Sequence, residues 1–289
     1  MRRTGPRFLV ASLLLACFPL VGWGQDDKAA KQKKAAEEIW KPVLNNDAPT
    51  IHETDNFLLI GTVDEKAMEK IGKALEKHLP FVMKSLRFEE DEDKHLLWEG
   101  KLIIHLCKDR TEFRTLYTKF KRERPLDDEI STYTHEGVIS HILVGPPSAG
   151  KSPLPLEVEV VGQLGAATLT RKRTARLPAW FVNGYARSHA YRAFPKLFVR
   201  ERQAAIALLA QGKKMGDVYA DTELAPAAVS VLRGSFVDFL ANSPQMTSYW
   251  PKFLGKIDDQ TSLDQIWESL RLKGENVQQA WMVWARSPR

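Results

Sequence analysis

The centre of the chain, from Leu154 to Tyr191, constrains the fold most because it joins two different kinds of sequence. Before it, short apolar runs alternate with amphipathic ones, which is typical of mixed α/β structure. After it, apolar residues recur at helical spacing. With 289 residues, the chain can form one large domain or two small ones. We expect an α+β fold, with a small mixed α/β lobe at residues 51–150 and an all-helical half at residues 151–289.

The N-terminal lobe is predicted from apolar runs and helix-start signals. The expected elements are a strand at 57–63, a helix containing Met68 and Leu86, a strand at 101–106, a helix after Asp109, and a hairpin at 131–144. Thr62 or Asp64 would cap the first helix, and Pro80 is expected to kink or divide it.

The helical half is clear from residue 178 onward, but the segment before it is ambiguous. Helices are expected at about 178–192 and 199–211, after Pro226, at about 247–256, after a Ser262 cap, and around Trp281. Leu156, Val158 and Val160 alternate as in a strand, whereas Val160, Leu164 and Ala167 repeat as in a helix. Gly162 and Gly165 would each cost a helix about 1 kcal/mol relative to Ala.

Residues Leu177 to Ala186 read LPAWFVNGYA. This segment resembles the L-P-x-W-x-x-E-G-x-A helix of the peptidase MA-like family, secreted relatives of the gluzincin zinc metallopeptidases. The resemblance covers roughly residues 55–286, and it implies a zincin-like fold with a helix at about 156–170. In gluzincins that helix carries H-E-x-x-H, in which two His bind Zn²⁺ and the Glu is the general base. The Glu before Gly in the second helix is the third ligand.

The residues that this chemistry requires are replaced. The resemblance puts Gly162 and Ala166 in place of the two His, Gln163 in place of the general base, and Asn183 in place of the third ligand. Gly and Ala have no ligating side chain, and neutral Gln and Asn are poor substitutes for carboxylates. We expect a catalytically inactive scaffold without a cofactor, which binds a peptide or protein or is a structural component. Its cleft between Gly162 and Asn183 would be apolar or neutral.

A divergent metal-dependent hydrolase with unusual ligands is the alternative. His189 follows Asn183 by nearly two helical turns, on a similar face, where Glu157 or Glu159 could join it. His135 is a further candidate ligand for such a site.

Two weaker site hypotheses arise from the hairpin and the loop after it. His135 and His141 flank the predicted turn and could approach each other across it to bind a metal. Gly145 to Ser152 matches the P-loop pattern G-x-x-x-x-G-K-[ST], which cradles phosphate ahead of a helix. Pro153 and Pro155 disfavour a helix there.

The N-terminus predicts export. Three arginines within the first seven residues precede an apolar run at residues 8–21, as in a signal peptide spanning residues 1–24 with cleavage after Gly24. The alternative is a lipoprotein anchored through Cys17. Either indicates a periplasmic or secreted protein. Residues 25–50 are expected to be a charged flexible linker. Cys107 is the remaining cysteine, so no internal disulfide is expected.

The charge balance says little about partners. Removing residues 1–24 takes away three arginines and lowers the formal net charge from +6 to +3. We therefore expect no nucleic-acid partner, and no transmembrane segment after signal removal. Arg171, Lys172, Arg173 and Arg176 form a basic run between the two central helices. They are either a solvated linker or a contact for an anion or acidic partner. The sequence leaves the oligomeric state open.

Overall fold

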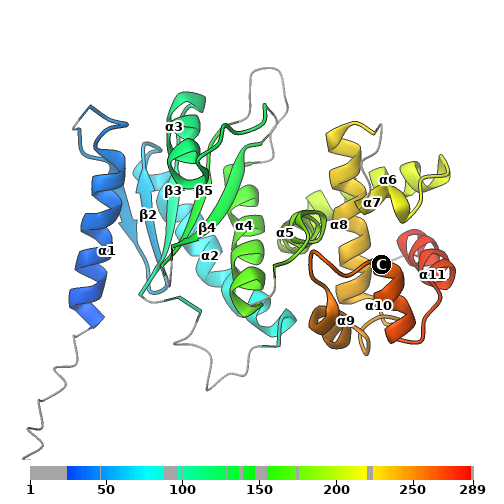
Figure 1. Ribbon diagram of the computed structural model, residues 1–289. Coiled ribbons are helices and arrows are strands. Elements are labelled where there is room, and N and C mark those ends of the chain that lie inside the picture. Colours follow the sequence, from blue (N-terminus) through cyan, green and yellow to red (C-terminus); the bar gives the residue numbers. More distant parts are fainter. Residues whose placement is uncertain are drawn as a thin grey trace, which may run out of the picture.

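The computed structural model is an α+β fold in which a five-stranded sheet is followed by a helical half (Figure 1). The structure describes residues 25–45, 47–87, 97–98, 100–127, 129–136, 139–146, 155–173, 176–219 and 224–287. The predicted signal peptide, Cys17 and the Gly24 cleavage site lie outside these ranges. The predicted fold class is confirmed. Within the described ranges, every helix is too short or too polar to be a membrane span.

The sheet is mixed, with three parallel strands at its centre. Its strands are β1 (Thr50–Glu53), β2 (Phe57–Gly61), β3 (Leu102–Leu106), β4 (Ser131–Glu136) and β5 (Ile139–Val144). Their order is β1-β2-β3-β5-β4: β2, β3 and β5 are parallel, and the two edge strands are antiparallel to their neighbours. The two predicted strands and the hairpin are present. Strand β1 was not predicted.

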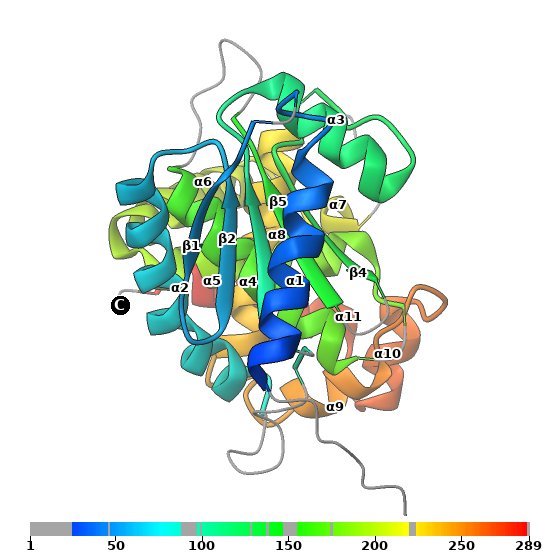
Figure 2. The ribbon, with the colours of Figure 1, turned by 90° about the vertical axis from the view of Figure 1, so that its left-hand side faces the viewer.

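Two helices, α1 (Gln25–Trp40) and α3 (Arg110–Lys121), cover one face of the sheet (Figure 2). The prediction of a charged flexible linker is wrong for α1, because Ala36 and Trp40 are fully buried against this face. Gln32 is also buried, and its Oε1 accepts a hydrogen bond from the backbone N–H of Lys101. These side chains lie four residues apart, so one stripe of a polar helix reaches the core.

The other face of the sheet packs on α2 (Glu65–Ser85) and α4 (Leu156–Lys172). Asp64 caps α2 by accepting a hydrogen bond from the N–H of Ala67. Pro80 lies inside α2 and does not divide it. Its side chain is exposed, where water can bond the carbonyl group that loses its helical donor. The ambiguous segment is helical, as the resemblance implied.

The helical half continues the same core. It comprises α5 (Ala179–Ala193), α6 (Pro195–Ala210), α7 (Gly216–Tyr219), α8 (Pro226–Asn242), α9 (Trp250–Lys256), α10 (Leu263–Ser269) and α11 (Gly274–Arg286). The helices predicted from residue 178 onward are all present, and Ser262 forms a capping box with Gln265. Phe236 and Trp281 are fully buried and belong to the apolar cluster that also contains Phe57 of the sheet. Val160 and Leu164 of α4 belong to the same cluster, so α4 packs against both predicted lobes.

Candidate functional site

Helix α5 lies between α4 and α8, and small residues bring the three helices into close contact (Figure 1). A Cβ atom on Gly162 of α4 would lie 3.1 Å from the carbonyl oxygen of Ala186. A Cβ atom on Gly184 would lie 2.7 Å from Cγ2 of Val237 on α8. Both glycines allow backbones to approach more closely than a side chain would permit.

A cleft of 550 Å³ opens above α4 and α5. Gly162, Gln163 and Asn183 line it, so three of the four positions singled out in the sequence lie around one cavity. Ala166, the fourth, is buried against Val182 and Ala186. The walls of the cleft are Leu126 and residues 129–131 on one side and the first turns of α8, from Pro226 to Arg233, on the other. The cleft therefore lies between the sheet and the helical half.

Charged and apolar side chains both line the cleft, which corrects the prediction of an apolar or neutral cleft. The side-chain amide of Gln163 donates to Oγ of Ser131 at 2.8 Å, and that hydroxyl donates to Oε2 of Glu159 at 3.3 Å. Burial raises the pKa of Glu159, although the positive charge of Arg187 and the Ser131 hydrogen bond oppose the shift. Asn183 is exposed and faces the cleft without a hydrogen bond to another described residue.

Arg187 supplies the positive charge on the α5 side of the cleft. Its guanidinium donates to Oε2 of Glu201 at 2.8 Å and to Oγ of Ser230 at 2.7 Å. Burial alone would raise the pKa of Glu201, but the charge and hydrogen bonds of Arg187 hold it below its usual value. The ion pair with Glu201 joins α5 to α6, and the hydrogen bond to Ser230 joins α5 to α8, so Arg187 is held in a fixed position beside the cleft.

The histidines do not gather as the metal hypotheses required. His135 pairs with Ser140 and bonds to Thr170 of α4, whereas His141 bonds to His105 on the opposite face of the sheet. They lie on opposite faces because successive residues of a strand alternate.

His189 and Asn183 line separate cavities, so the expectation of a similar face is wrong. Six residues advance an α-helix by about 240°. Glu157 pairs with Lys70, and Glu159 lies in the cleft rather than beside His189. Within the described ranges, no three His, Cys, Asp or Glu side chains are placed to share a metal ion.

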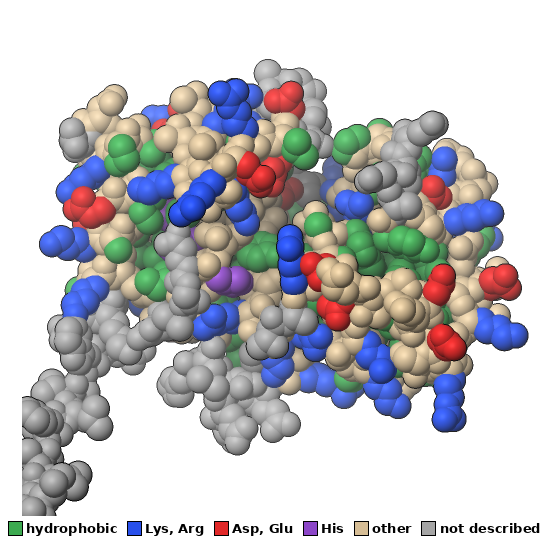
Figure 3. All heavy atoms as spheres, viewed as in Figure 1, with side chains coloured by type: hydrophobic (Ala, Val, Ile, Leu, Met, Phe, Trp, Pro, Cys, Tyr) green, Lys and Arg blue, Asp and Glu red, His purple; other side chains and the backbone are tan. Residues whose placement is uncertain are grey.

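The basic run between α4 and α5 contacts the protein itself. Arg171 donates to the carbonyl of Leu97 at 2.8 Å, and Arg173 donates to the carbonyl of Ile257 at 3.4 Å. Arg176 pairs with Asp259 at 3.3 Å. Lys172 is the last residue of α4. These side chains have partners within the protein, and their contact with an anion or an acidic partner stays a prediction. Figure 3 shows basic and acidic side chains interspersed on one face of the molecule.

The P-loop match falls mostly outside the described residues, which include Gly145 and Pro146 and resume at Pro155. Pro155 has φ −51° and ψ 141°, and α4 begins only at Leu156. A P-loop helix begins at the Lys-Ser end of the motif, which is here Lys151-Ser152. The structure therefore gives no support to a nucleotide site.

Sequence reasoning did not place Ser131, Glu159 and Arg187 at the cleft. A usable signal was present, because Glu159 precedes Gln163 by four residues and Arg187 follows Asn183 by four. Such pairs lie on one face of a helix. Ser131 required the tertiary fold, since it comes from an edge strand. In comparisons with known proteins, no protein-family model and no curated protein matches the chain.

Proposed function

We propose that the protein binds a peptide, or an extended segment of another protein, in the cleft above α4 and α5 without cleaving it. The observation that carries the proposal is the position of the cleft beside the edge strand β4, with Gly162, Gln163 and Asn183 along its floor. None of these three side chains is a zinc ligand of the gluzincin type or a general base near neutral pH.

The edge strand offers backbone groups to an extended ligand. Ile130 bonds to Gly145 through its backbone, so alternation directs the backbone groups of Ser131, Tyr133 and His135 away from β5. The carbonyl of Tyr133 accepts a hydrogen bond from Nζ of Lys121. Pairing by an added strand would therefore be favoured around Ser131, at the cleft.

Side chains in the cleft can form hydrogen bonds with the backbone of a bound peptide. The amide of Asn183 can both donate and accept hydrogen bonds, as a peptide group requires. Glu159 and Arg187 lie on the two helices of the floor, α4 and α5. Charges fixed in this way would select the direction and the charged side chains of a bound segment.

The test is to select binders from a random peptide library on the purified protein. The affinity of an enriched peptide is then measured with a labelled copy of it. Asn183→Trp fills the cleft from an exposed position and should weaken binding at least about tenfold. Asn276→Trp, at an exposed position on α11, is the matched control and should bind like the unchanged protein. Equal binding by both variants, or no enriched peptide, would contradict the proposal. Mass spectrometry of the recovered peptide tests whether it is cut.

The alternative proposal is a divergent metal-dependent hydrolase. Glu159 favours it, because a carboxyl group with a raised pKa in a cleft is a typical general acid or base. The decisive measurement is the metal content of protein expressed with added zinc and then dialysed. Near-stoichiometric zinc that is lost on mutation of His189 or His135, together with peptide cleavage that Glu159→Gln abolishes, would establish the hydrolase and refute simple binding.

A further inference from the structure

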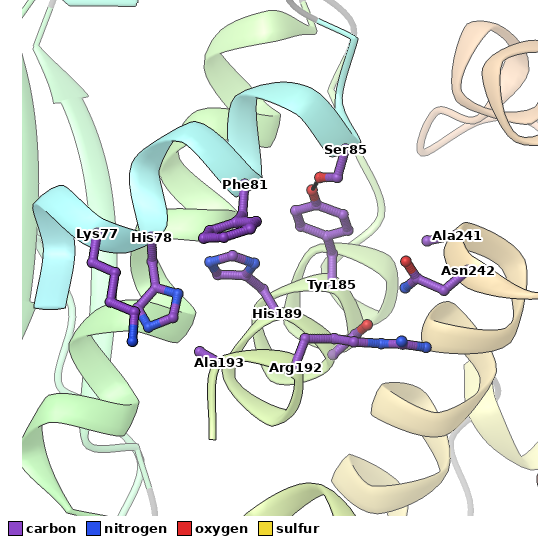
Figure 4. Close-up of a pocket in the computed structure, with 11 residues that line it drawn as sticks. Lys77, His78, Phe81, Ser85, Tyr185, His189, Arg192, Ala193, Ala241 and Asn242 are labelled. Atoms are coloured by element: carbon purple, nitrogen blue, oxygen red, sulfur yellow. Dashed lines mark hydrogen bonds between the residues drawn. The ribbon is translucent and has the colours of Figure 1, made fainter. Parts of the chain in front are cut away.

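A second cavity, of 370 Å³, lies on another side of α5 from the cleft. Figure 4 shows residues from the C-terminal half of α2, from α5 and from the end of α8 around it. Its volume is within the range of about 300–1,000 Å³ that is usual for small-molecule sites. No residue of this cavity belongs to the proposed peptide cleft.

One wall of the cavity is aromatic. His78 contacts the rings of Phe81 and His189, with centroid distances of 6.1 and 6.2 Å. Phe81 is 61% exposed although it is a large apolar side chain. Tyr185 completes this wall, and its hydroxyl is hydrogen-bonded to Ser85. Figure 4 shows Phe81 coming from α2 and His189 from α5. A flat apolar group is the natural partner for such a surface.

His189 carries an unused polar atom in this apolar surrounding. Its Nε2 is buried and has no hydrogen-bond partner among the described residues. Burial lowers the pKa of His189 to about 3, so the imidazole is neutral near pH 7. Buried polar atoms in proteins are nearly always satisfied, and an orphan in a cavity requires a specific explanation. Nε2 has almost no accessible surface in the unliganded structure, so a ligand atom in the cavity would supply the missing hydrogen bond after a small rotation of the His189 ring.

Of the cationic side chains that line the cavity from described residues, Arg192 has an ion-pair partner and Lys77 does not. Arg192 pairs with Asp238 through Nε at 2.7 Å and Nη2 at 3.1 Å. Ser188 and Asn242 also donate to Asp238, at 3.2 and 2.9 Å. Lys77 is exposed and has no ion-pair partner within the described part of the chain. A ligand with a single negative charge would balance Lys77.

We infer that this cavity binds a small aromatic monocarboxylic acid. The ring lies against Phe81 and Tyr185, the carboxylate accepts a hydrogen bond from the Nε2–H tautomer of His189, and Lys77 neutralises the charge. Each contact corresponds to a separate observation: the exposed ring of Phe81, the imidazole nitrogen without a hydrogen bond, and Lys77 without an ion-pair partner among the described residues. The inference does not depend on the proposed peptide binding, because the two cavities share no lining residue.

The experiment is titration of the purified protein with phenylacetate and indole-3-acetate, followed by calorimetry and by NMR of the histidine side chains. Phenylacetamide is the neutral matched ligand, because it keeps the ring and loses the charge. We expect at least one acid to bind at least tenfold more tightly than the amide, and to shift the His189 ring signals.

Three variants test the site itself. Ala241→Phe fills the cavity and should abolish acid binding, whereas Ala210→Phe, at an exposed position of α6, should leave it unchanged. His189→Leu should weaken the acid at least tenfold, and it should also weaken the amide, whose carbonyl oxygen can accept the same hydrogen bond. No binding of either acid at 10 mM, binding that survives Ala241→Phe, or equal affinity for acid and amide would overturn the inference. If a variant fails to fold, the His189 ring signals of the unchanged protein still show whether the acid binds at this cavity.

Discussion

The buried hydrogen-bond chain from Trp40 through His105 to His141 makes a sharp prediction about acid stability. The indole of Trp40 donates to Nδ1 of His105, and Nε2 of His105 contacts Nδ1 of His141, both at 3.0 Å. An indole only donates, so His105 is the acceptor at Nδ1 and carries its hydrogen on Nε2. His141 therefore accepts at Nδ1, and protonating that atom would break the chain.

The magnitude follows from the pKa of His141. Burial, with a smaller effect of His135, lowers it to about 4, against about 6.5 in an unfolded chain. Between these two pH values the unfolded chain binds a proton and the native protein does not, so acidification favours unfolding. The contribution of neutral His141 to the free energy of unfolding is fully present above about pH 6.5 and is lost as the pH falls toward 4. The part of it that is lost between pH 7 and pH 4.5 is about 2 kcal/mol.

His141→Asn is the variant that isolates this effect, because its Oδ1 can still accept from His105 while the side chain no longer titrates. Urea unfolding followed by tryptophan fluorescence at pH 7 and pH 4.5 measures it. With a slope of about 2 kcal/mol per M, the acid shift of the midpoint should be smaller by about 1 M in the variant. Phe120→Leu removes a ring against both histidines and should lower stability equally at both pH values. An unchanged acid shift in His141→Asn would refute the reasoning.

Three further predictions concern the helices around the sheet and the cleft. Trp40→Ala should cost about 3–5 kcal/mol in urea unfolding and expose α1 to proteolysis, because the side chain is fully buried. Glu159→Gln should raise the melting temperature at pH 7 and lose that advantage near pH 4, because burial penalises the ionised carboxyl; equal gains at both pH values would contradict this. The double variant Gly162→His/Ala166→His should be less stable by at least about 1–3 kcal/mol and bind no zinc by calorimetry, because α4 packs on α5 at both positions.

Much of the fold could be predicted because local signals agreed with tertiary structure. Helix α10 has the Ser262–Gln265 capping box that the sequence indicated. Helix α2 has the predicted apolar stripe, with Met68 and Leu75 fully buried. In such segments the periodicity of apolar residues and the cap residues specify the same boundaries.

Helix α1 shows where such reasoning fails. Its sequence is dominated by charged residues and alanine, and its two large apolar side chains, Ile39 and Trp40, both come at its end. The helix packs on the sheet because Trp40 has an acceptor, His105, in the core. That partner lies 65 residues away in the chain, so no local pattern could predict the contact. Gln32, Ala36 and Trp40, spaced by four, were the available hint.

The position of the candidate site could be predicted from the sequence, but its full set of lining side chains could not. The resemblance led to Gly162, Gln163 and Asn183, and these residues do line one cleft. Its charge was not predicted, although the four-residue spacing of Glu159 from Gln163 and of Arg187 from Asn183 was available in the sequence. Ser131 gave no such signal, because it comes from β4. Long-range pairing of this kind depends on how the elements pack, which local spacing does not specify.

Two of the four singled-out positions hold small residues, Gly162 and Ala166, and these have a structural consequence besides the absence of ligands. Gly162 places the backbone of α4 against the Ala186 carbonyl, and Ala166 packs on Val182 and Ala186. Space that two imidazole rings would need is therefore occupied by helix-to-helix contact. Such contact stabilises the fold through close packing, and it closes the position from which a metal would be held. A chain with this packing can present a cleft at Gln163 and Asn183, beyond the contact, as a binding surface joined to an edge strand. Binding at that surface requires no movement of α4 from α5, whereas zinc chemistry at the same positions would require the two helices to separate.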